Sequence, residues 1–180
     1  PVKWIEDRME NLMAANHSRE QVYRLRAAVD ETGYILAVDN EFFTSQGAYV
    51  RTHGATVSDL SAAMLPGPYM VPAYRAKGRV RLTNKTPCGT YRAPGRYEST
   101  FARERLVDVI AHRMGIDPVE MRRRNLIPPE LMPYSRGIAN HGTPLVYDSG
   151  DYAKLLDRLM DYIGYDDLRA ELAARRAQGE

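Results

Sequence analysis

The sequence predicts an α+β fold in which antiparallel strands come first and helices pack on the sheet that they form. Two β-rich runs joined by a short glycine turn stand near the start, and a run of alternating apolar and basic residues ends at residue 82. Most segments with an apolar residue every three or four positions come later, from residue 96 onward. Strands gathered before helices favour this class over a regular βαβ alternation.

The first strands are indicated by apolar residues among charges. Residues 2–5 are expected to form a short strand, followed by a short helix around 10–15. Residues 21–29 and 34–44 read as the two arms of a β-hairpin, because the turn Asp30-Glu31-Thr32-Gly33 places its glycine at the end.

Residues 71–82 give the clearest alternation and predict a strand with one apolar and one basic face. Three roles stay open for the basic face: exposure to solvent, contact with another domain, or binding of phosphate. It has no interleaved aromatic residues for base stacking, so we expect no nucleic-acid partner. The basic residues are Arg75, Lys77, Arg79 and Arg81.

The helices follow a period of 3.6 residues. A helix over 56–64 is ended by Pro66 and Pro68. A longer one over 96–114 carries apolar residues every four positions and stops at Gly115. The next begins at the cap Asp117, with a proline in the first helical position.

The chain divides into a main body and an extension. The main body, residues 1–147, holds the strands, a loop at 86–96, the helices of 96–126 and an ordered loop at 128–147 that is rich in proline, glycine and tyrosine. Residues 148–180 form a helical extension that stops inside a helical pattern. We therefore expect a piece of a longer protein.

Bulk composition is ordinary for a globular protein, with 44% apolar and 27% charged residues. The net charge of +2 is too small to predict nucleic acid or an anionic membrane as a partner. No apolar run approaches the roughly 20 residues of a membrane span. The single cysteine, Cys88, excludes an internal disulfide and a cysteine-rich metal site, and a reducing, cytoplasmic location fits it.

The histidines do not predict a metal site. One of the four has a potential ligand at helical spacing, since Asp108 precedes His112 by four residues. A solvated helix face explains such a pair more simply than a metal does. The others are His17, His53 and His141.

The stretch TPCGTYRAPGRYES, residues 86–99, is the strongest candidate site. Pro94 and Gly95 bring the backbone to the start of a long helix, whose first amides are unsatisfied donors. Arg92 and Arg96 add positive charge, and Glu98 is placed to reach back towards the amide of Gly95. An anionic group or an oxo-ligated metal centre would suit this corner, although a plain strand-to-helix connection stays open.

Thr90-Tyr91-Arg92-Ala93-Pro94-Gly95-Arg96 resembles the active-site loop of the molybdenum hydroxylases, whose bacterial forms read Ala-Tyr-Arg-Gly-Ala-Gly-Arg or Ala-Tyr-Arg-Cys-Ser-Phe-Arg. These are the large subunits of xanthine dehydrogenase, aldehyde oxidase and aerobic carbon monoxide dehydrogenase. The flanks are similar too: PVKWIEDR at residues 1–8 and DPVEMRRRNL at 117–126 follow in the family's order.

The resemblance implies part of a molybdenum cofactor-binding domain, in an enzyme that oxidises carbon with oxygen from water. Arg92 and Ala93 would lie at the molybdopterin, while Tyr91, Pro94 and Gly95 would line the substrate space. The family's catalytic glutamate lies near the end of the whole subunit, so no catalytic residue and no direct metal ligand is expected in this segment.

Departures from the family narrow the chemistry. The copper-containing carbon monoxide enzymes have a cysteine directly after the loop arginine, where this chain has Ala93. Cys88 lies five residues earlier, so we expect no copper. Pro94 falls where the xanthine-oxidising members stack an aromatic ring on the substrate, which favours a small aldehyde or heterocycle over xanthine.

As part of such a subunit, the chain would work with the remaining parts of the large subunit and with iron–sulfur and flavin subunits or domains. The isolated chain is then expected to be inactive and to bind no cofactor. The alternative is a non-catalytic interaction module that uses the basic strand face.

Overall fold

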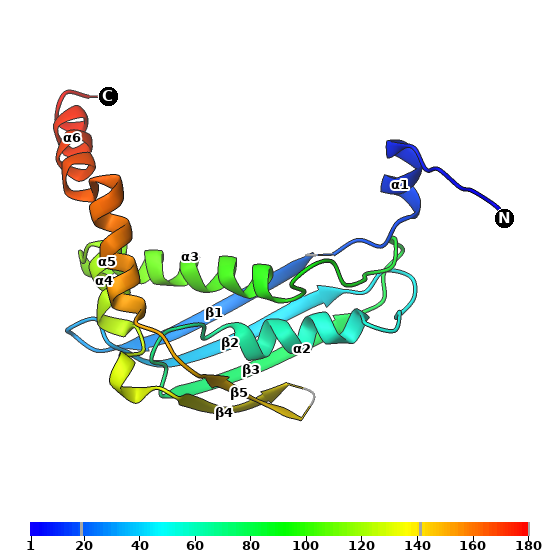
Figure 1. The fold of residues 1–180 in the computed structure, drawn as a ribbon, viewed down its shortest axis with the longest axis horizontal. Helices are drawn as coiled ribbons and strands as arrows, with labels where there is room; N and C mark the ends of the chain where they lie inside the picture. Colours follow the sequence, from blue (N-terminus) through cyan, green and yellow to red (C-terminus); the bar gives the residue numbers. More distant parts are fainter. Residues whose placement is uncertain (19, 141, 180) are drawn as a thin grey trace.

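The computed structural model describes residues 1–18, 20–140 and 142–179, so that His141 lies outside the described residues. A three-stranded sheet carries two helices on one face, and a separate hairpin and two further helices follow (Figure 1). The strands are β1 (Gln21–Val29), β2 (Ile35–Ser45), β3 (Ala73–Arg81), β4 (Tyr134–Asn140) and β5 (Thr143–Tyr147). The helices are α1 (Arg8–Ala14), α2 (Gly54–Met64), α3 (Arg96–Met114), α4 (Pro118–Asn125), the short 3-10 helix η1 (Pro129–Leu131), α5 (Tyr152–Ile163) and α6 (Tyr165–Ala177).

The main sheet has the order β1-β2-β3 and is mixed. β1 and β2 form the expected antiparallel hairpin, with Arg24 opposite Glu41. β3 runs parallel to β2, which corrects the expectation that the first strands are all antiparallel. The physical reason is α2, since a helical crossover returns the chain to the end of the sheet where β2 began.

The core lies between this sheet and helices α2 and α3. β1 alternates between half-buried and exposed residues, as expected of a strand with one covered face. α3 lies along β1, and α2 lies along β3 (Figure 1). The α+β class with helices packed on a sheet is confirmed. The central buried residues are Ile35, Val38, Leu65, Tyr69, Val71, Ala102, Val107, Ile110, Ala111 and Met121.

Asn125, the last residue of α4, joins this helix to the β1–β2 hairpin. Its side chain is almost completely buried. The amide nitrogen donates to the carbonyl oxygens of Gly33 and Met121, both at 2.9 Å, and the amide oxygen accepts from the N–H of Ile35 at 2.8 Å. One side chain thus satisfies backbone groups at the hairpin turn, which would otherwise be buried without partners.

Two sequence-based expectations for the secondary structure are wrong. Residues 2–5 form no strand, because no strand in the described part of the chain pairs with them, and Val2, Trp4 and Ile5 are exposed. Residues 128–147, expected as a loop, contain η1 and the β4–β5 hairpin. Arg136 anchors this hairpin, because it lies against the rings of Tyr134 and Tyr147 and donates to the carbonyl of Gly67.

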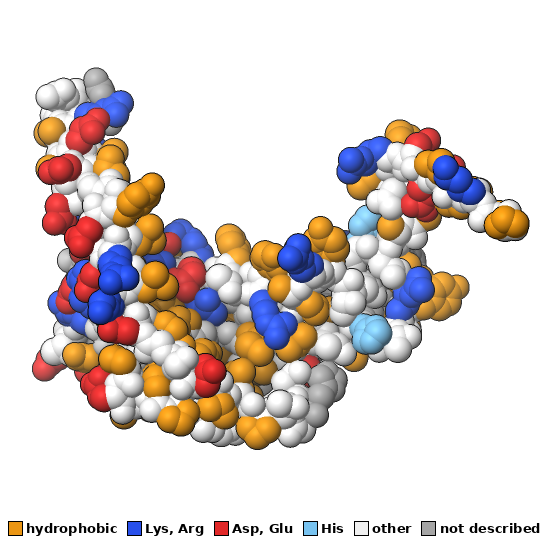
Figure 2. Space-filling view, viewed as in Figure 1, with side chains coloured by type: hydrophobic (Ala, Val, Ile, Leu, Met, Phe, Trp, Pro, Cys, Tyr) orange, Lys and Arg blue, Asp and Glu red, His pale blue; other side chains and the backbone are white. Residues whose placement is uncertain are grey.

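Helices α5 and α6 project from the body as an arm (Figures 1 and 2). An apolar stripe on α5 faces outward, with Leu155, Leu159 and Tyr162 at least half exposed. Arg123 on α4 ties the arm to the body through an ion pair with Asp157 at 2.7 Å. Among the described residues, no helix is both long and apolar enough to cross a membrane.

Replacing Asn125 with alanine should lower the free energy of unfolding by about 2–3 kcal/mol, because the N–H of Ile35 and the carbonyl of Gly33 would stay buried without partners. Urea denaturation followed by circular dichroism measures this. Asn84→Ala, at an exposed bend, is the matched control and should change the free energy by less than about 0.5 kcal/mol. Equal effects of both substitutions would contradict the role of Asn125.

Candidate cofactor and substrate loop

The candidate loop connects β3 to α3 and is fixed at its start by the N-terminal segment. The N–H of Cys88 donates to the carbonyl of Gln46 at 2.9 Å. The N–H of Gly89 donates to the carbonyl of His17 at 2.8 Å, and the N–H of His17 donates to the carbonyl of Pro87 at 3.2 Å. The two bonds of His17 form a short bridge between residues 17 and 88, so the loop begins on a fixed backbone.

Gln46 and Gly47 support the loop, and the sequence reasoning missed both. Gln46 is fully buried after the end of β2, and its side-chain nitrogen donates to the carbonyl of Gly54 at 3.1 Å. Gly47 has φ +70°, and a Cβ there would lie 2.2 Å from the carbonyl oxygen of Thr86. Only glycine fits such an approach. The sequence feature that could have identified these two residues is a Gln-Gly pair directly after a strand.

The end of the loop is fixed by two residues with left-handed backbone. Ala93 has φ +56° and is the one non-glycine residue with positive φ in the described part of the chain. Its carbonyl accepts from the N–H of Arg96 at 3.2 Å. Gly95 has φ +73° and packs on α2, where a Cβ would lie 2.6 Å from the backbone nitrogen of Ser61. Helix α3 therefore begins against the backbone of α2.

The predicted site residues are contiguous but differ in exposure. Tyr91 is 68% exposed, and Arg92 is exposed beside it. Ala93 and Pro94 are half-buried, and Gly95 is buried. The loop thus presents its tyrosine and arginine outward and uses its glycine as the anchor. The roles of all five residues at cofactor and substrate stay predictions.

Cys88 is held inside the loop. Its side chain is 6% exposed. Burial raises the pKa of its thiol above the ordinary value, and the negative charges of Glu98 and Glu20 act in the same direction. The thiol is therefore protonated and shielded at neutral pH, which makes it a poor nucleophile and a poor ligand.

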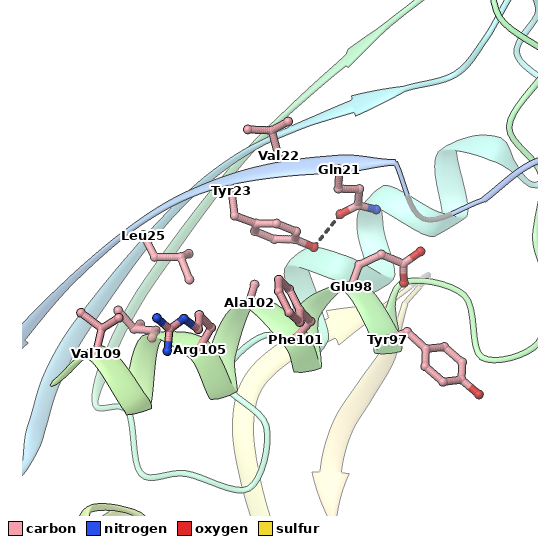
Figure 3. Close-up of a pocket in the computed structure, with 11 residues that line it drawn as sticks. Gln21, Val22, Tyr23, Leu25, Tyr97, Glu98, Phe101, Ala102, Arg105 and Val109 are labelled. Atoms are coloured by element: carbon pink, nitrogen blue, oxygen red, sulfur yellow. Dashed lines mark hydrogen bonds between the residues drawn. The ribbon is translucent and has the colours of Figure 1, made fainter. Parts of the chain in front are cut away.

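A groove of about 820 Å³ runs between β1 and α3, directly after the loop (Figure 3). We call it the β1–α3 groove. Glu98, in the first turn of α3, is buried at one end of it. Tyr23 donates to Gln21 on the opposite wall. Its lining residues are Gln21, Val22, Tyr23, Leu25, Tyr97, Glu98, Phe101, Ala102, Arg105, Leu106 and Val109.

Within the described part of the chain, no group of three or more histidine, cysteine, aspartate or glutamate side chains is arranged to hold a metal ion. The chemistry that the loop itself offers is that of backbone groups, the guanidinium groups of Arg92 and Arg96, and small side chains. Such a set can hold an anionic or polar group at the mouth of a helix.

Comparison with known proteins places this geometry in a family. The molybdopterin cofactor-binding domain model matches residues 1–126. The 6-hydroxypseudooxynicotine dehydrogenase complex subunit gamma of Paenarthrobacter nicotinovorans is 43% identical over 179 residues, which are 99% of this chain and 22% of that protein.

Solved structures agree. Quinoline 2-oxidoreductase from Pseudomonas putida 86 superposes with a TM-score of 0.86 at 33% identity, over 98% of this chain and 22% of that one. A Cu,Mo-CO dehydrogenase superposes with a TM-score of 0.81 at 31% identity, over 96% of this chain and 22% of that one. The chain therefore spans about a fifth of the length of these relatives, and it belongs to the molybdopterin cofactor-binding domain family.

Gly95→Ala should destabilise the chain by about 3 kcal/mol, because a left-handed alanine costs about 1–2 kcal/mol and the new methyl group also clashes with α2. The matched control is Gly115→Ala, which has φ +67° but no atom within 4 Å of its added Cβ. That control should lose only the conformational part, about 1–2 kcal/mol. Urea denaturation of both variants isolates the packing contribution, and equal losses would contradict the contact with α2.

The Cys88 thiol should react with iodoacetamide much more slowly than free cysteine at pH 8, because it is buried and its pKa is raised. In 6 M urea the same thiol should react at the rate of a free thiol. Mass spectrometry reads the reaction without ambiguity, since the chain has one cysteine. Fast modification of the folded chain would contradict the buried position.

Proposed function

We propose that the chain is one segment of the catalytic large subunit of a molybdenum hydroxylase, and that residues 86–96 form one wall of its cofactor cleft. The observation that carries the proposal is the family match over residues 1–126, which contains this loop. A non-catalytic interaction module, the alternative from sequence, is disfavoured by the same match. The activity belongs to the longer subunit, and the isolated segment is expected to be inactive.

The residues present fit a molybdopterin group. Ala93 adopts a left-handed backbone, which non-glycine residues keep only where the surroundings hold them and which is common at ligand clamps. Arg92 beside it is exposed and carries a permanent charge, which suits phosphate and oxo anions. Small side chains in this stretch leave the backbone approachable.

Each loop residue has a distinct part in this proposal. Arg92 and Ala93 would hold the cofactor edge, the first through its guanidinium and the second through its backbone. Tyr91 and Pro94 would line the substrate space. Gly95 would contribute backbone there and fix the loop to α2. When bound, the cofactor supplies the redox chemistry and the transfer of an oxygen atom that comes from water.

For the substrate we propose a pyridine- or quinoline-type heterocycle rather than the purine xanthine or carbon monoxide, with a small aldehyde as the second choice. Relatives at 43% and 33% identity are named for a hydroxylated nicotine derivative and for quinoline. We also propose that no copper is bound, although a Cu,Mo enzyme is 31% identical. Ala93 has no ligand atom in its side chain, and Cys88 is buried against other parts of the fold.

The partners proposed for the longer subunit are iron–sulfur and flavin subunits or domains, which would carry the electrons away from the site. A relative is named as a subunit of a dehydrogenase complex, which supports such an assembly. A cytoplasmic location is part of the same proposal.

In the full-length subunit, Arg92→Met should lower kcat/KM for quinoline-type substrates by about 100-fold, as expected for the loss of one charged group at the reacting centre. Arg113→Met, on the exposed end of α3, is the control and should leave kcat/KM unchanged. Elemental analysis of the same preparations gives their molybdenum and copper content.

Three results would count against the proposal. Wild-type activity of Arg92→Met would remove its role, and copper-dependent oxidation of carbon monoxide would overturn the argument from Ala93. Stoichiometric molybdenum in the isolated 180-residue chain would show that the cofactor does not need the rest of the subunit.

A further inference from the structure

Strand β1 has an open edge. It lies at the end of the sheet order and pairs with β2 on one side only. Among the described residues, no backbone hydrogen bond reaches its outer edge. A nine-residue edge with unpaired amides and carbonyls is a template for another strand unless something covers it.

An apolar stripe on α3 lies next to this edge. Tyr97, Phe101 and Val109 form this stripe, with the charged Arg105 between Phe101 and Val109, and all four residues line the β1–α3 groove at a spacing of four (Figure 3). Phe101 is 74% exposed and Tyr97 is 53% exposed. Because these exposed side chains of α3 lie next to the open edge of β1, an additional strand at that edge would have an apolar face to pack on.

The opposite face of the sheet is cationic. Residues paired across the three strands form two rows on this face. One row is Arg26, Asp39 and Arg75, and the next is Arg24, Glu41 and Lys77. Asp39 is bound by both arginines of its row, which lower the pKa of its carboxyl to about 2. In the described part of the chain Arg24, the outermost residue of its row, makes no ion pair. An acidic residue on a strand beside β1 would lie next to it.

We propose that an extended segment of the same subunit, from outside these 180 residues, adds to the open edge of β1 as a fourth strand. Its inward side chains would be apolar and fill the β1–α3 groove, and its outward side chains would be acidic and meet Arg24 and Arg26. This inference rests on the proposal that the chain is part of a longer subunit, as its coverage of 22% of its relatives supports.

The dimensions select a strand. The stripe from Tyr97 to Val109 covers twelve helical steps, or about 18 Å at 1.5 Å per residue. An extended segment of about five or six residues spans the same length. A helix would bring its own satisfied backbone and leave the edge of β1 open, whereas a strand pairs with that edge and fills the groove at once. Phe43, at the cationic face, is covered by Arg81, so base stacking by a nucleic acid is not favoured there.

Photo-cross-linking in the full-length subunit, purified with its partner subunits, tests the proposal. Phe101→p-benzoylphenylalanine keeps an aromatic ring in the groove and should form a cross-link within the same subunit. The peptide found by mass spectrometry should lie outside these 180 residues and alternate apolar with acidic residues. The same replacement of Tyr49, which is 72% exposed on a loop, should not capture that peptide.

The proposal of a fourth strand would be overturned if Phe101→p-benzoylphenylalanine formed no cross-link, or cross-linked only to another subunit, only within the 180 residues or to nucleic acid. A cross-linked peptide without alternating apolar and acidic residues would also overturn it. As a second measurement, Arg24→Gln should lower the thermal midpoint of the full-length subunit by a few degrees, whereas Arg113→Gln should not; equal shifts would contradict the acidic face. Molybdenum content is read separately, so a subunit that forms the cross-link but holds no molybdenum would refute the proposed function and leave the fourth strand standing.

Discussion

The contact between Gly95 and helix α2 is the constraint on which the candidate site depends. α3 can begin only where the backbone of residue 95 reaches α2 without a side chain, because Val57, Leu60 and Ser61 occupy the space that a Cβ would need. That contact fixes the start of α3 and the end of the loop together. Bonds from residues 17 and 46 fix the beginning of the loop. Tyr91 and Arg92 are therefore presented from a stretch that is held at both ends.

The mixed sheet supplies the rest of this support. Because α2 crosses over and β3 returns parallel to β2, the ends of both strands point to the same edge of the sheet. The loop after β3 therefore passes beside the Gln46-Gly47 pair after β2, where the N–H of Cys88 donates to the backbone carbonyl of the buried Gln46. A purely antiparallel arrangement would have sent the loop to the opposite edge. The location of the site thus follows from the direction of a single strand.

The parts of the fold that the sequence predicts are those with local periodic signals. The bounds of α3 were predicted as observed. Apolar residues such as Ala102 and Ile110 recur at helical spacing, and Gly115 marks the end of the helix. The direction of β3 depends on a crossover whose geometry leaves no periodic trace. The β4–β5 hairpin was missed because its prolines and glycines are typical of loops, while its anchor, Arg136, bonds to backbone about seventy residues away. Ala93 stood out only through a family motif, whereas Arg92 was also marked by its charge at the start of a helix, and the supporting role of Gln46 is recognisable only once its burial is known.

The left-handed backbone of Ala93 also limits how this loop can change over evolution. Glycine occupies this position in one of the bacterial forms of the motif, and glycine adopts such a backbone without strain, while asparagine and aspartate tolerate it. Branched side chains such as valine or isoleucine would have to distort the turn that α3 starts from. The backbone conformation therefore limits which residues can replace Ala93, whatever their effect on the chemistry. New substrate preferences should arise more readily at Tyr91 and Pro94, whose backbones carry no such restriction.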